Sequence, residues 1–157
     1  MSARWDNHFL GLALAHALMS KDPNTQVGSL IIGPDREVRS MGFNGFPRGI
    51  DDTQERLSDR ELKNRLMVHA EMNAILNAAR VGISMKGCTL YLVATDSSGG
   101  IWGGPPCVRC SVEIIQSGIA EIVSYPFKDV PSKWKDDIEF ARKLLVETGI
   151  NYREVTK

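Results

Sequence analysis

The spacing of hydrophobic residues along the chain predicts four main helices. Between residues 3 and 20, apolar side chains recur every three to four positions, as they do on one face of a helix. The same spacing returns in three later segments, and a shorter polar segment also favours a helix. The predicted helices span residues 3–20, 58–64, 68–81, 107–117 and 132–148. Pro23, Gly82 and Gly118 follow three of them and mark where those helices end.

Short apolar runs between these helices predict strands. The clearest is Thr89–Thr95, and strands at 26–32 and 37–43 flank a turn and therefore form a hairpin. The last two strands are expected at 120–125 and 151–155. Because the later strands alternate with helices, we expect them to pair in parallel through right-handed crossovers. The pattern predicts an α/β fold with three layers, α/β/α, and a mixed five-stranded sheet.

Two long segments interrupt this regular pattern. Residues 44–57 form a loop that contains glycine and proline, and residues 96–104 form a second loop that carries Trp102. Loops of this length often serve binding or catalysis. No repeat, low-complexity tract or linker divides the sequence. We therefore expect residues 1–157 to form a single domain.

Composition and charge narrow the class of protein. The chain has 43% hydrophobic residues, and its 19 Lys and Arg residues balance 19 Asp and Glu residues. This balance disfavours a polynucleotide partner, which usually needs a basic stripe. No apolar run approaches the roughly 20 residues that span a membrane, and Arg4, Asp6 and His8 interrupt any secretory pattern. We expect a cytoplasmic protein that binds neither nucleic acid nor a membrane.

The strongest chemical signal is the run His69–Glu71 together with Pro106–Cys110. They match the H-x-E and P-C-x-x-C arrangement of zinc deaminases. Cys107 and Cys110 are three residues apart near a predicted helix N-terminus, so they share a face where thiols ionise readily. A catalytic zinc takes three protein ligands and leaves one position to water. We expect His69, Cys107 and Cys110 to bind one Zn²⁺ per chain.

Glu71 is the expected acid–base catalyst. Zinc lowers the pKa of a bound water, and Glu71 would take that proton and deliver it to the ring that loses ammonia. A closed structural zinc site is the main alternative, and it would need a fourth ligand from His8, His16 or Cys88. A redox C-x-x-C pair would leave His69 and Glu71 unexplained.

At these residues the chain resembles the cytidine deaminase superfamily, and its first half is similar to deoxycytidylate (dCMP) deaminases. The resemblance is carried by the stretches Trp5–Asp6, Ser20–Gly28, Gly42–Pro47 and His69–Ile75. It implies a cytidine-deaminase-like fold and zinc-dependent hydrolysis of dCMP to dUMP and ammonia, a reaction that feeds thymidylate synthesis. It also implies a homo-oligomer, a hexamer or a dimer, which dCTP activates and dTTP inhibits with Mg²⁺.

The residues that would contact the nucleotide are less well marked than the metal ligands. The candidates are Ser20, Lys21, Asn24, Asn44, Arg48, Trp102 and Tyr125, with Phe43 and Gly45 as allosteric candidates. Asn44 has the groups to bind a sugar or phosphate, Gly45 lets a backbone N–H approach a ligand, and Arg48 suits a phosphate. Alternatively, the Ser20–Asn24 segment only caps and turns the chain, and the Asn44 loop is a solvated turn.

Two aromatic residues have roles that the sequence leaves open. Tyr125 is expected to stack on a base at the end of a strand or to belong to the core. Trp102 either forms a wall of the pocket or packs against a neighbouring subunit. Its loop, residues 96–105, is longer than is usual in the family. The same chemistry on a modified dCMP, cytidine or guanine therefore stays open, as does a non-catalytic nucleotide sensor.

Overall fold

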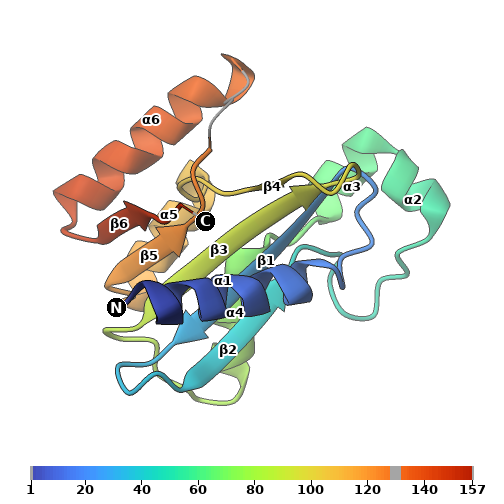
Figure 1. The fold of residues 1–157 in the computed structure, drawn as a ribbon. Coiled ribbons are helices and arrows are strands. Elements are labelled where there is room, and N and C mark those ends of the chain that lie inside the picture. The colour runs from blue at the N-terminus through green and yellow to red at the C-terminus, as the bar shows by residue number, and fades with distance from the viewer. Residues whose placement is uncertain (1, 128–131, 157) are drawn as a thin grey trace.

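The computed structural model describes residues 2–127 and 132–156, and in this part of the chain six strands form one sheet. The strands are β1 (Thr25–Ile32), β2 (Val38–Phe43), β3 (Thr89–Asp96), β4 (Ile101–Trp102), β5 (Glu121–Ser124) and β6 (Asn151–Glu154). The helices are α1 (Ala3–Ala17), α2 (Gln54–Ser58), α3 (Arg60–Leu66), α4 (Ala70–Arg80), α5 (Val108–Ser117) and α6 (Ser132–Glu147). Figure 1 shows α1 on one face of the sheet and α4 on the other.

The sheet order confirms the predicted topology and adds one strand. The main order is β2-β1-β3-β5-β6, with antiparallel pairing of β1 to β2 and β3 and parallel pairing of β3, β5 and β6. The sixth strand, β4, pairs with the end of β3 inside the segment that we expected to be a loop. A strand of two residues is too short to show an alternating pattern, so β4 could not be predicted from hydrophobic spacing.

Several element boundaries also differ from the predicted ones. Helix α1 ends at Ala17 instead of residue 20, because the following residues form a hydrogen-bonded turn. The loop expected at 44–57 contains α2, a five-residue helix that the Thr53 side chain caps by accepting from the backbone N–H of Arg56. Helix α4 begins at Ala70 because Val68 is held in a short bridge to Gly45.

Two hydrophobic clusters fill the two faces of the sheet, as the alternation along β3 shows. Leu90 and Leu92 face a cluster with residues of α4 and α5, whereas Tyr91 and Val93 face a cluster with residues of α1. Leu145 places α6 with the first cluster. The three-layer α/β/α arrangement is therefore confirmed. In the described residues, no helix combines the length and the apolar character needed to cross a bilayer.

Glycines let two helices lie close to the sheet. A Cβ atom at Gly28 would overlap the backbone of Ala13 in α1, and one at Gly42 would overlap the backbone of Ala70 and Ala74 in α4. Side chains then fasten α4 to β2, since the Ser40 hydroxyl donates to the Ala74 carbonyl at 2.6 Å. The close position of α4 thus depends on glycine at position 42, which has no side chain to separate the helix from β2.

An ion pair between a buried carboxylate and a partly exposed guanidinium joins α1 to β6. Asp6, 2% exposed, accepts two hydrogen bonds from the Arg153 guanidinium, both at 2.7 Å, and one from the Tyr91 hydroxyl at 2.8 Å. Arg153 also contacts Glu121 at 2.9 Å. Burial alone would raise the pKa of Asp6, but the bonds from Arg153 and Tyr91 outweigh it and hold the pKa below its ordinary value.

Replacing Asp6 should therefore reveal a pH-dependent contribution to stability. Asp6→Asn leaves Arg153 without its carboxylate and should lower the free energy of unfolding near pH 7 by about 2–3 kcal/mol, measured by urea denaturation. Because the folded pKa of Asp6 lies below the unfolded one, its stabilisation is full above about pH 4 and is lost as the pH falls through the folded value. The difference in free energy of unfolding between wild type and variant should therefore shrink in acid.

Glu61→Gln is the control, because it alters an exposed ion pair. Its unfolding curve should match that of the wild type. A loss of stability equal to that of Asp6→Asn would contradict the role given to Asp6.

Gly42→Ala should displace α4 and lower the free energy of unfolding by about 1–3 kcal/mol, because the added methyl group meets helix backbone. Gly11 is the matched control, since a Cβ there would meet nothing within 4 Å. Gly11→Ala should raise stability by about 0.5–1 kcal/mol, the usual gain within a helix. Urea unfolding of both variants measures the difference. A neutral Gly42→Ala variant would show that α4 does not depend on this close approach.

Candidate metal centre and active site

The N-termini of α4 and α5 lie together and bring the predicted metal ligands into one place. His69 and Cys107 occupy the N-cap positions of these two helices. N-cap side chains usually bind backbone N–H groups of their own helix, but neither of these two does so. Instead, Nδ1 of His69 lies 3.5 Å from Sγ of Cys107 and 3.3 Å from Sγ of Cys110.

The donor atoms of His69, Cys107 and Cys110 fit a zinc ion. They all lie within 4.8 Å of one another, and ligands of a tetrahedral zinc lie about 3.5–4 Å apart. Within residues 2–127 and 132–156, no fourth His, Cys, Asp or Glu joins the group. His8, His16 and Cys88, the spare ligands of a closed site, are thus absent from it. Three ligands of this kind suit a metal that keeps one position for water.

The two cysteines differ in their protonation in the absence of a cation. The Cys110 thiol donates to Cys107 and, with His69, holds the pKa of Cys107 well below that of a free thiol, against the opposing effect of burial. The same contact, together with burial, raises the pKa of Cys110. A thiolate at Cys107 therefore disfavours ionisation of Cys110. A divalent cation between them removes that repulsion, so the pair is suited to metal binding.

Glu71 lies in the first turn of α4, next to this group. Its side chain is only 5% exposed, although an ionised carboxylate is costly to bury. Burial raises the pKa of Glu71, the neighbouring His69 opposes the shift, and Cys107 adds to it. A carboxyl group with a raised pKa can accept and release a proton near neutral pH, as an acid–base catalyst must.

Helix α6 completes the N-terminus of α5. Because the Cys107 side chain does not cap its helix, the backbone N–H of Val108 needs another acceptor, and Oδ2 of Asp137 accepts it at 3.2 Å. Asp137 was not among the residues predicted for the site. Its distance of 30 residues from Cys107 in the chain leaves no local signal for this contact.

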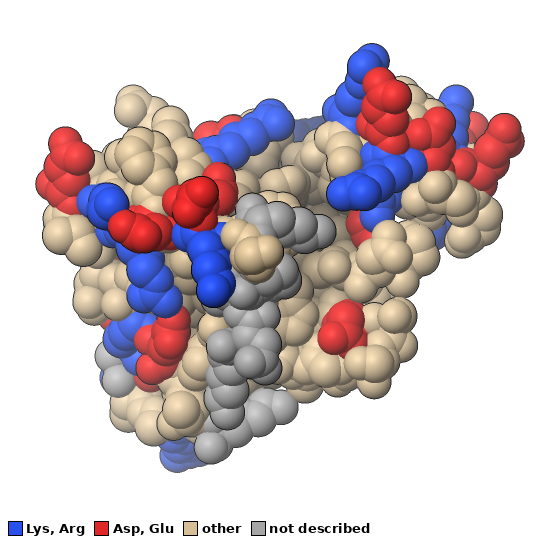
Figure 2. All heavy atoms as spheres, turned by 90° about the horizontal axis from the view of Figure 1, so that it is seen from above, with Lys and Arg blue, Asp and Glu red and all other residues tan. Residues whose placement is uncertain are grey.

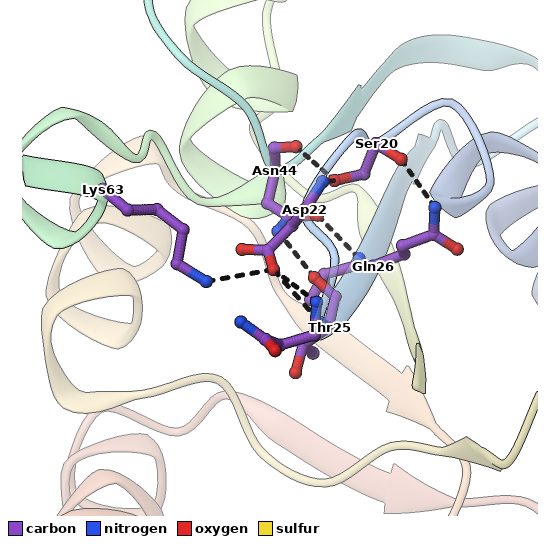
Figure 3. Close-up of polar contacts among 8 residues, drawn as sticks. Ser20, Asp22, Thr25, Gln26, Asn44 and Lys63 are labelled. Carbon is purple, nitrogen blue, oxygen red and sulfur yellow. Dashed lines mark hydrogen bonds and ion pairs between the residues drawn. The ribbon is translucent and has the colours of Figure 1, made fainter. Parts of the chain in front are cut away.

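Asn44 joins the end of β2 to the start of β1 (Figure 3). Its side-chain oxygen accepts from the backbone N–H of Val27 at 2.7 Å, and its amide nitrogen donates to the Thr25 carbonyl at 2.9 Å. The Ser20 hydroxyl donates to the Asn44 carbonyl at 2.8 Å. Both polar atoms of the Asn44 side chain thus have partners, and its contact with a substrate stays a prediction.

A buried ion pair fixes the turn that follows α1. Oδ1 of Asp22 accepts from the backbone N–H groups of Asn24 and Thr25 and from Nζ of Lys63 at 3.1 Å. The side chains of Asp22 and Lys63 are 7% and 11% exposed. This pair was not predicted from the sequence, because Lys63 lies in a short, mostly polar segment 41 residues away from Asp22. Asn24, predicted to contact substrate, is exposed on this turn.

Lys21 and Arg48, the two cationic candidates, are both paired in the structure. Nζ of Lys21 lies 2.8 Å from Oδ1 of Asp52, and Nη2 of Arg48 donates to Oδ1 of Asn77 at 2.6 Å. Both contacts are exposed. Long cationic side chains in exposed pairs exchange partners at little cost, so neither contact prevents binding of a phosphate.

The two allosteric candidates lie at the end of β2. The N–H of Gly45 donates to the Val68 carbonyl at 3.1 Å, and the N–H of Val68 donates back at 2.9 Å. The backbone N–H that we expected to meet a ligand is therefore used within the chain. The ring of Phe43 packs edge-on against His16, with centroids 5.3 Å apart. A role for either residue in regulation stays a prediction.

A surface hollow of about 270 Å³ lies beside the turn after α1. It is lined by Ser20, Lys21, Asp22, Pro23, Gln26, Gln54 and Ser97. Ser97 belongs to the long loop between β3 and α5, so that loop borders the same space as the candidates Ser20 and Lys21. The fold thus joins two segments that lie far apart in the sequence.

The two aromatic candidates lie on opposite faces of the sheet. Tyr125 is 8% exposed and belongs to the core cluster with Phe9 and Tyr91, on the α1 face. This is the core alternative that the sequence left open. Trp102 pairs with Ala94 across β3 and β4 and stacks on Phe127, with ring centroids 4.7 Å apart.

On the face of the molecule shown in Figure 2, charges of both signs occur. In Figure 2, basic and acidic side chains are intermingled, and no stripe of Lys and Arg crosses the visible face. The chain carries 19 residues of each sign. The absence of a polynucleotide partner stays a prediction.

Comparisons with known proteins agree with this geometry. Residues 3–125 match the family model of the cytidine and deoxycytidylate deaminase zinc-binding region. The human deoxycytidylate deaminase is 32% identical over 155 residues, which cover 96% of this chain and 79% of that protein. An uncharacterized deaminase encoded in the luxG 3′ region of Aliivibrio fischeri is 33% identical over 151 residues, covering 96% of this chain and 92% of that protein.

Solved structures show the same fold. The dCMP deaminase of cyanophage S-TIM5, in complex with dCMP and dUMP, superposes with a TM-score of 0.74 at 18% identity, covering 99% of both chains. A Thermotoga maritima diaminohydroxyphosphoribosylaminopyrimidine deaminase/reductase gives a TM-score of 0.65 at 22% identity, with 97% of this chain and 36% of that one covered. With the match over residues 3–125 and the His-Cys-Cys group beside Glu71, the chain belongs to the cytidine and deoxycytidylate deaminase family.

Proposed function

We propose that the protein is a zinc-dependent dCMP deaminase that hydrolyses dCMP to dUMP and ammonia. The observation that carries the proposal is the group of His69, Cys107 and Cys110 beside the buried carboxyl of Glu71. The similarity to named deoxycytidylate deaminases over most of the chain supports dCMP as the substrate. The reaction belongs to pyrimidine deoxynucleotide metabolism.

The residues divide the chemistry between them. His69, Cys107 and Cys110 would hold a zinc ion, and zinc at this place would supply a water whose pKa is lowered toward neutral pH. Glu71 takes the proton of that water and gives it to N3 of the cytosine ring. The water oxygen would add to C4, and the hydroxyl formed there would give its proton through Glu71 to the amino group. The C4–N bond would then break to release ammonia, and C4 would keep its oxygen as a carbonyl. Burial of Glu71 supports this role, because it raises the pKa toward the working pH.

The nucleotide would be held by residues at the same edge of the sheet. We assign Asn44 to the sugar and Lys21 or Arg48 to the phosphate, with Ser20 and Asn24 in the adjoining turn. Lys21 supports this assignment because it lines the 270 Å³ hollow and needs only to leave an exposed partner.

Regulation and assembly extend the proposal. By its family, the protein would form a homo-oligomer, a hexamer or a dimer, with dCTP as activator and dTTP as inhibitor, each with Mg²⁺. Phe43 and Gly45 are the candidate effector residues. We also propose that residues 1–157 act as one domain in the cytoplasm. The Asp6–Arg153 pair supports a single domain, since it ties the first helix to the last strand.

The second candidate function keeps the chemistry and changes the base. The segment between β3 and Pro106 is long, and part of it lines the hollow beside Lys21. A deaminase for a modified dCMP, cytidine or guanine would use the same metal centre. A non-catalytic nucleotide sensor would have no use for a buried carboxyl at Glu71.

Replacement of Glu71 should separate metal binding from catalysis. Purified wild type should hold about one zinc per chain. Glu71→Gln should keep that zinc, measured by metal analysis, but lower kcat about 10²–10⁴-fold, because an amide cannot carry the proton. Cys110→Ser should lose most of the zinc. Glu113→Gln, on the helix that carries Cys110, is the control and should retain both zinc and activity. Full turnover by Glu71→Gln would remove Glu71 from the mechanism.

A substrate panel should identify the nucleotide. Ammonia release should be fastest with dCMP among dCMP, CMP, deoxycytidine, dCTP, 5-substituted dCMP and guanine. Measured at subsaturating dCMP, the rate should rise with dCTP and fall with dTTP, and each effect should require Mg²⁺. A low rank for dCMP would assign the same chemistry to another base, and binding without ammonia release would favour the sensor.

A further inference from the structure

The segment that precedes Cys107, residues 96–106, contributes a strand to the sheet. The Asp96 side chain accepts from the backbone N–H groups of Ser98 and Gly100 and so closes the turn before β4. Ile101 and Trp102 then pair with β3. The segment that was predicted to be a loop is instead a hairpin arm that extends the sheet.

Two glycines hold the far end of this arm against β5. A Cβ at Gly103 would overlap the backbone of Tyr125, and the N–H of Gly104 donates to the hydroxyl of Ser124 at 3.1 Å. Gly104 has φ +120°, a conformation that favours glycine. Residues 103–106 are buried. Trp102 is therefore held at both ends, five positions before the metal ligand Cys107.

The register of β4 decides which face of the sheet Trp102 occupies. Directly opposite residues of an antiparallel pair lie on the same face, and Trp102 is opposite Ala94. Ala94 is two residues from Leu92, which packs in the cluster with Cys110 and Ile114 of α5. Residues two apart in a strand share a face. Trp102 thus lies on the face that carries the metal centre, whereas Tyr125 packs on the other.

The indole of Trp102 is supported from one side. It stacks on Phe127 with ring centroids 4.7 Å apart and an angle of 20° between the rings, yet it is only partly buried. A stack of two rings presents a flat, uncharged surface. Such a surface suits the face of a planar, uncharged ring, such as a pyrimidine base.

We propose that the Trp102–Phe127 stack is a specificity element that packs against the base of the substrate at the metal centre. This inference rests on the proposed deaminase function and assigns base recognition to a segment outside the two metal motifs. Trp102 would hold the ring and leave the proton transfers to Glu71. Its loss should therefore weaken binding more than it slows the chemical step.

Steady-state kinetics test this division. Trp102→Ala should raise KM for dCMP about ten- to hundredfold, the range expected when one base loses its aromatic partner, with a smaller change in kcat. Trp102→Phe, which keeps a ring, should restore most of the affinity. Ile101→Ala is the matched control, because Ile101 is the neighbour of Trp102 in β4 and its side chain lies on the other face of the sheet. It should behave as wild type. A change in kcat alone, or equal effects of Trp102→Ala and Ile101→Ala, would overturn the proposal.

Fluorescence tests the contact without turnover. In zinc-loaded Glu71→Gln with Trp5 and Trp134 replaced by phenylalanine, Trp102 is the remaining tryptophan of the three in the chain. A stacked base should quench its emission as dCMP is titrated, and deoxyribose 5-phosphate, which lacks a base, should not. Quenching by both ligands, or by neither while equilibrium dialysis shows dCMP bound, would overturn the proposal.

The same titration distinguishes this proposal from the proposed function. If the panel shows that the wild type deaminates a different base, the preferred nucleotide replaces dCMP in both experiments. Quenching by that nucleotide, with the KM change in Trp102→Ala, would support the stack although dCMP is not the substrate. Deamination of dCMP without either effect would refute the stack and leave the proposed function standing. Circular dichroism and zinc content of each variant show that the fold is intact.

Discussion

The site depends on the convergence of two helix N-termini at one edge of the sheet. His69 and Cys107 stand at N-cap positions, where a side chain normally satisfies its own helix. Here both turn to each other, and the positive ends of two helix dipoles face the thiolate. The helix N-termini therefore help to stabilise negative charge at the site. This arrangement requires that α4 and α5 be placed accurately by other parts of the fold.

The sheet places α4 through close packing and α5 through an outside partner. Gly42 removes the side chain that would keep α4 away from β2, and the Ser40 and Asn73 side chains bind the facing backbone at 2.6 and 2.7 Å. At α5, Asp137 supplies the cap that Cys107 does not provide. Hydrogen bonds from other side chains thus position α4 and α5, whose own N-terminal side chains face the candidate metal site.

Buried polar side chains also fix two irregular segments near the site, the turn after α1 and the end of β2. Asn44, Asp22 and Lys63 bind backbone or one another with little access to water. An unpaired group there would be costly, so these contacts fix the turn after α1 and the end of β2 relative to each other (Figure 3). Residues expected to touch substrate therefore also shape the scaffold, and a conformational change on binding would have to replace these bonds.

The sequence by itself determined the long elements, the α/β class and the metal-binding group. Periods of 3.6 and 2 residues are local properties, and the spacing of His69, Glu71, Cys107 and Cys110 carries its own chemistry. Strand β4 and helix α2 could not be predicted from the sequence, because two and five residues are too few to show a hydrophobic period.

Only the tertiary structure decided which distant residues meet. Lys63 reaches Asp22, Asp137 caps α5, and the register of β4 puts Trp102 and Tyr125 on opposite faces. A shift of one residue in that register would reverse the face of Trp102. Such pairings follow from long-range packing and hydrogen bonding, which leave no periodic trace along the chain.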